Sequence, residues 1–284
     1  MTGGIELGGT KTVVAVGMSD GAIAGQHRFP TTTPAETIDT AARWLTDNGP
    51  VERLGIATFG PVGLAPHHDH FGKILQTPKP NWSGFDLMES LRDQLGDLPI
   101  SLDTDVNAAA LAEQRRGAGR GLEDLAYITI GTGIGAGLIA QGRPVNGALH
   151  PEFGHLKVPR HPDDPFPGCC PYHRDCLEGL ASGTAMRERW KTEALHLPND
   201  HLAWEFEIWY LAHAVLSLLA ITCPTRVIIG GGVSQAPGFH GKVEAKLRDL
   251  AGGYFSTLEK NSPYVLFPEL GQDAGITGAL LLGG

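Results

Sequence analysis

The 284-residue chain is 42% apolar and 19% charged, a composition that fits a globular protein and excludes a disordered one. Its length allows one large domain or two of ordinary size. The net charge of −9 argues against a nucleic-acid partner, which would call for a basic face, but leaves small anionic ligands open.

The first residues, MTGGIELGGTKTVVAVG, lack the basic and apolar regions of a signal peptide. No apolar run reaches the roughly 20 residues that span a bilayer. The best candidate, LAHAVLSLLAITCP, is short and carries His213, which favours a buried helix. We therefore expect a cytoplasmic protein without a membrane partner. In that compartment clustered cysteines are more often metal ligands or redox-active thiols than disulfides.

In chain order, the hydrophobic pattern predicts strands at residues 3–7, 11–16 and 22–29, a helix from Thr33 and Pro34, strands at 54–59 and 100–102, and a helix at 105–116. A second hairpin follows at 125–130 and 135–140, then a helix at 204–222, a strand at 226–229, and helices at 241–250 and 274–282. Hairpins followed by strand–helix alternation in both halves predict an α/β protein with mixed sheets.

The segment RRGAGRG, residues 115–121, marks the predicted boundary between two lobes. It separates a smaller N-terminal α/β lobe, residues 1–116, from a larger C-terminal α/β lobe, residues 117–284. The last helix, about residues 273–283, either stays with the C-terminal lobe or packs back on the N-terminal one.

The first glycine-rich turn, GGTK, consists of Gly8, Gly9, Thr10 and Lys11. Glycines let successive N–H groups point into one concavity that binds phosphate oxygens, and the last two residues would add a hydroxyl and a charge. Glu6 precedes the turn, where it could reach a phosphate-bound Mg²⁺ directly or through water. An ordinary hairpin turn explains the same residues equally well.

The central glycine-rich turn contains Gly131, Thr132, Gly133 and Gly135. It matches the dinucleotide fingerprint G-x-G-x-x-G/A, but that fingerprint requires a following helix, and here a strand follows. We therefore interpret it as a second phosphate-binding hairpin. The third cluster, at residues 230–232, ends a buried strand and offers a flat wall for a ring such as adenine.

Three of the four cysteines lie in GCCPYHRDCLEG, residues 168–179. Cys170, His173 and Cys176 have the spacing of a chelating turn, and His155 precedes them. Two thiolates and two imidazoles suit tetrahedral Zn²⁺, and four protein ligands would make that zinc structural. Cys169 is an alternative to Cys170, and reduced thiols in a loop are the alternative to a metal site.

The segments GIELGGTK, TDVNAAALAE, YITIGTGIGAG, HPEFGHLKV, CPYHRDCLEGLASG and VIIGGGV occur in the order seen in ROK-family sugar kinases. The chain resembles this family over essentially its whole length, and the bacterial fructokinase branch most of all, because of Glu6, Thr104 and the CPYHRDC segment. The resemblance implies the two-lobed actin-like, hexokinase-type ATPase fold, with ATP and sugar in the cleft between the lobes. It also implies a homodimer.

The resemblance further implies that the first and second glycine turns bind the phosphates of ATP, with Mg²⁺, and that Gly230, Gly231 and Gly232 face the adenosine. Asp105 would be the catalytic base, because a sugar hydroxyl needs a carboxylate to orient it and accept its proton. The alternative is that Asp105 serves only as a helix N-cap. Asn107 would be either a sugar contact or a brace at the start of the helix.

Glu152, His155 and Glu178 match the sugar-hydroxyl ligands of the family, so His155 would serve both sugar and metal. Thr104 stands where glucose-specific relatives usually have Asn, which favours fructose. The expected function is an ATP-dependent fructokinase that makes fructose 6-phosphate. Alternatives are a hexokinase acting mainly on mannose or glucose, and a sugar-sensing regulator, although such regulators carry a DNA-binding motif ahead of the first strand.

Overall fold

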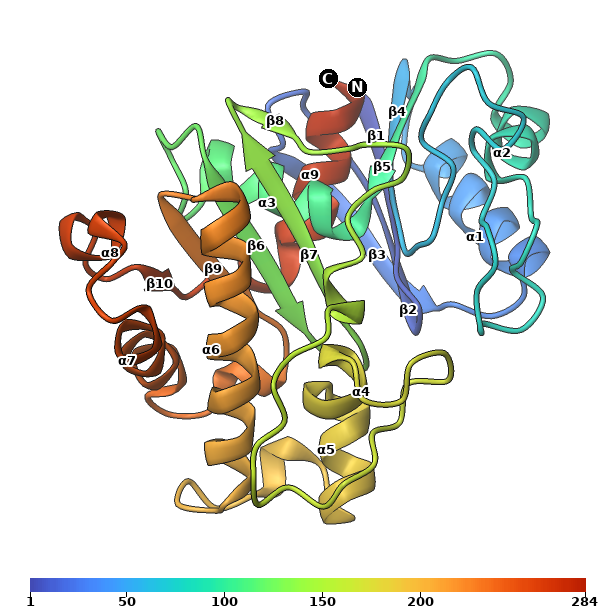
Figure 1. Cartoon of the computed structure of the whole chain (residues 1–284). Coiled ribbons are helices and arrows are strands. Elements are labelled where there is room, and N and C mark those ends of the chain that lie inside the picture. Colours follow the sequence, from blue (N-terminus) through green and yellow to red (C-terminus); the bar gives the residue numbers. More distant parts are fainter. The chain divides into compact units, whose positions relative to one another are not determined.

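The computed structural model describes residues 1–284, and the chain forms two compact units (Figure 1). Unit 1 contains Met1–Gly117, Pro144–Pro151 and Leu270–Gly284, and unit 2 contains Ala118–Arg143 and Glu152–Glu269. The short central segment Pro144–Pro151 belongs to unit 1, although it lies beyond residue 116. The last helix also belongs to unit 1, which is one of the two placements that the sequence left open.

Unit 1 is built on a five-stranded sheet of order β3-β2-β1-β4-β5. Its strands are β1 (Thr2–Leu7), β2 (Lys11–Gly17), β3 (Ile23–Pro30), β4 (Arg53–Thr58) and β5 (Ile100–Thr104). Strands β1, β4 and β5 are parallel, and Leu7, Thr58 and Thr104 occupy one row across them. The segments that follow β1 and β5 therefore leave the sheet at the same edge, where open α/β sheets usually bind ligands.

Helices cover both faces of the unit 1 sheet: α1 (Pro34–Asp47), α2 (Leu87–Leu95), α3 (Asp105–Arg116) and α9 (Ala274–Gly283). Alternate residues of a strand point to opposite faces, and β2 shows this directly. Val14 belongs to the core beneath α1 and α2, whereas Val13 belongs to the core with Ala108 of α3 and Ile276 of α9. The last helix thus completes the core of unit 1.

Unit 2 repeats the arrangement with a sheet of order β10-β9-β6-β7-β8. Its strands are β6 (Leu125–Ile130), β7 (Ile134–Ala140), β8 (Arg143–Pro144), β9 (Arg226–Gly230) and β10 (Val265–Leu266). Its helices are α4 (Leu177–Ala181), α5 (Gly183–Trp190), α6 (Ala203–Thr222), α7 (Phe239–Ala251) and α8 (Ser256–Lys260). In both units the first strand of an antiparallel hairpin pairs in parallel with a later strand. The predicted α/β, two-lobed class is confirmed.

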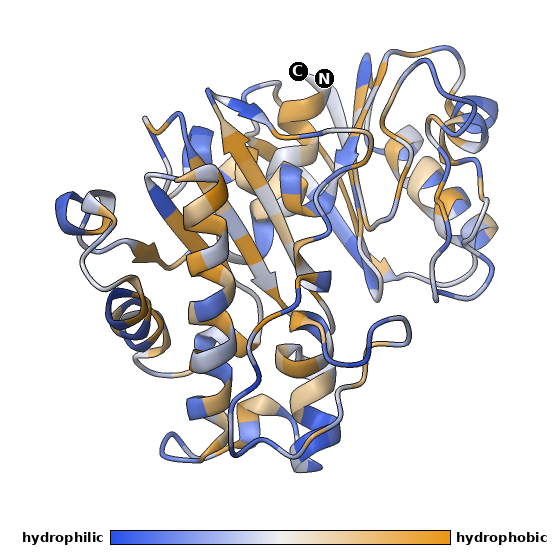
Figure 2. Cartoon of the chain, viewed as in Figure 1, coloured by the Kyte–Doolittle hydropathy of each residue, from blue (hydrophilic) through white to orange (hydrophobic).

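Helix α6 is the longest helix of the chain and carries many apolar residues (Figure 2). Its length and a mean hydropathy of 1.3 would allow it to cross a membrane, but half of that stretch is buried within the fold. The helix packs against α4 and α7, so its apolar surface serves the core of unit 2. One such helix, half of it buried in the fold, is therefore weak evidence for a membrane span.

The predicted elements match the observed ones to within two residues at each end. The pattern missed α2, although its Asp86 accepts a hydrogen bond from the Glu89 N–H, a capping signal present in the sequence. It also missed α4, α5, α8, β8 and β10, all short. Short elements carry little periodic signal and are held by tertiary contacts.

Candidate active site and metal centre

The first glycine turn joins β1 to β2 at the carboxyl edge of the unit 1 sheet. The Gly8 N–H donates to the Lys11 carbonyl at 3.0 Å, and Thr31 donates through its hydroxyl to the Gly8 carbonyl at 2.8 Å and through its N–H to the Thr10 carbonyl at 3.0 Å. The N–H groups of Gly9 and Thr10 donate to no group of the protein. The carbonyl oxygens of the turn accept hydrogen bonds within the protein, whereas two of its N–H groups remain available. An anion requires such available N–H groups.

Asp105 is the first residue of α3, at the same sheet edge as the first glycine turn. The N-cap is Thr104, whose hydroxyl accepts from the Asn107 N–H at 3.1 Å. Capping was the alternative role for Asp105, and the structure gives it to Thr104. The Asp105 carboxylate accepts from the Val106 N–H at 2.9 Å, and the helix N-terminus favours its ionised form.

Asn107 braces the start of α3. Its buried amide donates to Asp103 Oδ1 at 2.8 Å and to Asn146 Oδ1 at 3.2 Å. Both donors of the side chain are therefore used within unit 1, which favours the bracing role over the sugar contact. Asp103 was missed by the sequence reasoning, and burial raises the pKa of its carboxyl group. Its signal was the first aspartate in LDTD, near the end of β5.

The second glycine turn joins β6 to β7 in unit 2. The Gly183 N–H donates to the Gly131 carbonyl at 2.8 Å, and the Thr184 hydroxyl donates to the Thr132 carbonyl at 2.8 Å. The N–H groups of Thr132 and Gly133 donate to no group of the protein. This turn therefore repeats the pattern of the first, with α5 holding the carbonyls and the amides left for an anion.

The third glycine cluster lies beside the second turn, because β9 pairs in parallel with β6 and sets Gly230 opposite Thr129. Gly231 has φ +92°, and a Cβ there would lie 2.3 Å from the Ile130 carbonyl oxygen. Only glycine fits this position. Gly135, predicted in the phosphate loop, lies within β7 and also pairs with Thr129.

Glu178 reaches the second glycine turn from α4. Its Oε2 accepts a hydrogen bond from the Ile134 N–H at 3.0 Å. A Cβ on Gly133 would lie 2.4 Å from the same oxygen, so the carboxylate rests directly against the turn. The sequence assigned Glu178 to the sugar by resemblance and gave no sign of this contact.

Glu152 immediately precedes the short 3₁₀ helix Phe153–His155 of unit 2. Burial, together with the charge of Glu178, raises the pKa of Glu152 to about 7. A carboxyl group that titrates near neutrality can accept hydrogen bonds from hydroxyls when ionised and loses that capacity when protonated. The structure thus brings Glu152, Glu178 and the second glycine turn into one part of unit 2.

The predicted metal ligands converge. The ligand atoms of His155, Cys170, His173 and Cys176 all lie within 4.8 Å of one another. The two sulfur atoms lie 3.6 and 3.8 Å from His155 Nδ1, and Cys170 Sγ lies 3.8 Å from His173 Nδ1. Tetrahedral Zn²⁺ would separate its sulfur and nitrogen ligands by about 3.6 Å, so distances and donor types both fit zinc. Cys169 lies outside the group, which decides between the two neighbouring cysteines.

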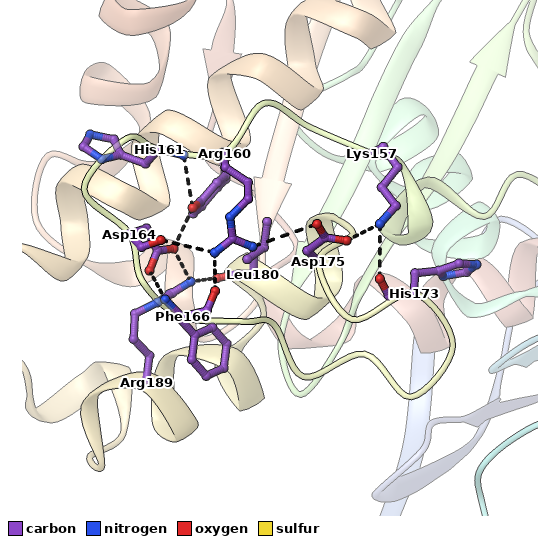
Figure 3. Close-up of polar contacts among 10 residues, drawn as sticks. Lys157, Arg160, His161, Asp164, Phe166, His173, Asp175, Leu180 and Arg189 are labelled. Atoms are coloured by element: carbon purple, nitrogen blue, oxygen red, sulfur yellow. Dashed lines mark hydrogen bonds and ion pairs between the residues drawn. The ribbon is translucent and has the colours of Figure 1, made fainter.

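Polar contacts hold the segment that carries these ligands (Figure 3). Lys157 donates to the His173 carbonyl at 3.1 Å and pairs with Asp175. Further along, the buried Asp164 carboxylate pairs with Arg189 at 2.9 Å and accepts from the Tyr210 hydroxyl at 2.6 Å. Breaking a buried pair of this kind leaves an uncompensated charge. The segment is therefore held near its two ends by Lys157 and Asp175 and in its middle by Asp164.

Glu6 is partly buried in unit 1 and accepts from the Ile276 N–H at the start of α9. Burial raises the pKa of its carboxyl group, and its Oε2 has no hydrogen-bond partner. Mg²⁺ is usually bound by one or two carboxylates together with phosphates and waters. A single carboxylate with one unpartnered oxygen fits a shared, nucleotide-borne Mg²⁺ but not a complete protein site.

A family model of the ROK family matches residues 2–283. The chain belongs to the ROK family. This ROK protein is 41% identical over 288 residues to a fructokinase of Zymomonas mobilis, with 99% of this chain and 95% of the relative covered. It is 38% identical over 282 residues to a fructokinase of Pediococcus pentosaceus, with 99% and 97% covered.

The fold of this ROK protein also matches a crystal structure of a ROK glucokinase from Streptomyces griseus in complex with glucose and AMPPNP. The TM-score is 0.74 at 27% identity, and 99% of this chain and 98% of that chain are covered. The resemblance to ROK proteins and the sugar-kinase fold expected from the sequence are confirmed.

Proposed function

We propose that this protein is an ATP-dependent fructokinase that transfers a phosphoryl group to the 6-hydroxyl of D-fructose and yields fructose 6-phosphate. Near-full-length similarity to fructokinases carries the proposal. The structure supports the proposal in two ways. Thr104, and not Asp105, caps helix α3, and Asp105 lies at the same sheet edge as the Gly8–Lys11 turn with its available N–H groups.

Asp105 orients the fructose 6-hydroxyl and accepts its proton as the new oxygen–phosphorus bond forms and the bond between the β- and γ-phosphates breaks. The electron pair of the broken bond leaves with ADP. The free amides of Gly9, Thr10, Thr132 and Gly133 bind phosphate oxygens, and Gly230, Gly231 and Gly232 lie against the adenosine. Transfer depends mainly on positioning and charge stabilisation, which these groups supply.

Glu152, His155 and Glu178 accept from or donate to fructose hydroxyls. Glu6 would offer one carboxylate oxygen to Mg²⁺, which would supply positive charge at the phosphates of ATP. His155, Cys170, His173 and Cys176 would hold structural Zn²⁺, which would fix the segment that leads to Glu178.

An ADP-release assay over fructose, mannose, glucose, glucosamine and N-acetylmannosamine tests the proposal. We expect fructose to give the highest kcat/KM. A higher value for mannose or glucose would make the protein a hexokinase of different preference, and no ADP release with any sugar would reject the kinase assignment.

We also propose a cytoplasmic homodimer. All four cysteines are unpaired, as a thiolate zinc site in a reducing compartment requires. Light scattering after size exclusion measures the mass, and 30.1 kDa, the mass of one chain, would exclude the dimer. Cell fractionation checks the compartment.

A further inference from the structure

A lysine that the sequence reasoning left unassigned lies at the first glycine turn. Lys79 Nζ donates to the Gly9 carbonyl, and the ammonium lies 5.9 Å from the centre of the Phe59 ring. These are its only polar or aromatic partners, and no carboxylate pairs with it. By contrast Lys73, on the same connection between β4 and α2, pairs with Asp86 at 3.7 Å.

The loop that carries Lys79 is braced. The Thr77 hydroxyl accepts from the Lys79 N–H at 3.4 Å, and Ser83 bonds both the N–H and the carbonyl of Thr77 at 3.0 Å. In the same loop, the fully buried Trp82 donates through its indole N–H to the Thr32 carbonyl at 3.0 Å. The ammonium is thus held at the turn by a built scaffold and is not simply a mobile surface charge.

An unpaired cation costs free energy when it is partly buried, and burial lowers the pKa of Lys79. An ammonium has three donors, and Gly9 takes one of them. Two donors and a whole positive charge remain beside the free amides of Gly9 and Thr10. A polyanionic group is the ligand that would satisfy both the charge and the donors.

We propose that Lys79 contacts the phosphoryl group in transfer and stabilises the charge on its oxygens. The assignment rests on the proposed kinase function. The transferred group must lie beside the base, and the Gly8–Lys11 turn shares its sheet edge with Asp105. Lys79 changes no bond in the reaction and keeps its proton. It acts as a fixed cation at the γ-phosphoryl group while Asp105 takes the hydroxyl proton.

The test uses Lys79→Met, which keeps an apolar stem of similar length without the charge, and Lys79→Arg, which keeps the charge. Lys73→Met is the matched control. We expect Lys79→Met to lower kcat by about 10²–10³-fold, the loss typical of one preorganised donor. The KM for fructose should stay within about threefold because uniform sugar binding is untouched. Lys79→Arg should recover part of kcat, and Lys73→Met should match the wild type.

Nucleotide binding provides a readout that loss of structure would not produce. Lys79→Met should weaken binding of AMPPNP about tenfold, the loss expected for a charge-assisted contact, and leave the affinity for ADP, which lacks the γ-phosphoryl group, unchanged. A kcat near the wild-type value, equal losses for ADP and AMPPNP, or a loss only in fructose KM would overturn the role of Lys79. If Lys79→Met melts early, Lys79→Gln takes its place under the same criteria.

These outcomes separate the two proposals. A wild-type protein that releases no ADP with any sugar rejects the kinase function itself and the role of Lys79 with it. A wild-type protein that turns over fructose while Lys79→Met is equally active rejects only the role of Lys79.

Discussion

The Glu178 carboxylate accepts a hydrogen bond from the Ile134 N–H at 3.0 Å. The bond joins α4, which follows the metal segment by one residue, to the second glycine turn. A residue assigned to the sugar therefore also fixes a turn assigned to ATP. Removal of the Glu178 charge should therefore weaken the binding of both fructose and nucleotide.

Glu178→Gln keeps the shape of the side chain and removes its charge. We expect weaker binding of fructose and of AMPPNP together, by about 1–3 kcal/mol in total, because hydrogen bonds to charged groups are the strong ones. Calorimetry with each ligand measures the effect. Glu188→Gln, on α5, is the control and should bind both ligands normally. A change in fructose binding alone would contradict the link.

Asp105→Asn should lower kcat by about 10²–10⁴-fold, the usual contribution of general base catalysis, with ATP binding retained. The amide can still take a hydrogen bond but accepts no proton at neutral pH. The free energy of unfolding should change little because Thr104, and not Asp105, caps α3. Near-normal turnover would exclude Asp105 as the base.

Glu152 gives the sugar affinity a pH dependence. With its pKa at about 7, the carboxyl group is ionised above that pH and protonated below it. We expect kcat/KM for fructose to fall as the pH is lowered through 7, approaching a tenfold loss per pH unit. Glu152→Gln should have lower activity, and its kcat/KM should not show this fall at low pH. If the variant still lost kcat/KM as the pH was lowered through 7, the pH dependence would belong to another group and not to Glu152.

The metal centre should hold about one zinc per chain, measured by elemental analysis of the protein as purified. Cys176→Ala should lose the metal, whereas Cys169→Ala should keep it because Cys169 lies outside the ligand group. Removal of zinc by a chelator should weaken fructose binding or unfold the segment between Lys157 and Cys176. Normal fructose kinetics in protein shown to be metal-free would refute a supporting role.

Two substitutions of Thr104 test its role in stability and its role in sugar specificity separately. Thr104→Val should lower the free energy of unfolding by about 1 kcal/mol, the usual loss for an N-cap. Thr104→Asn should keep the cap, because asparagine caps as well as threonine, while shifting the ratio of kcat/KM towards glucose. Denaturant unfolding and the sugar screen measure the two effects. An unchanged sugar ratio would remove Thr104 from the specificity determinants.

Much of the site could be predicted from local patterns. The glycine clusters followed strand-like runs, and a strand followed by glycines limits the chain to a few turn geometries. The spacing of Cys170, His173 and Cys176 identified a chelating turn because their ligand atoms are close along the chain. Resemblance to ROK proteins then gave roles to Asp105, Glu152 and Glu178 that composition alone did not give.

The sequence by itself predicted the α/β class, the long elements, the glycine turns and the four metal ligands, with Cys169 left as an alternative to Cys170, since most of these features depend on residues close in the chain. Only the tertiary structure decided that Cys170 and not Cys169 joins the ligands, and that Lys79 reaches the Gly9 carbonyl. These contacts depend on how strands pair and loops fold back. Local propensity carries no information about partners tens of residues away, and burial and hydrogen-bond satisfaction select among the locally equivalent choices.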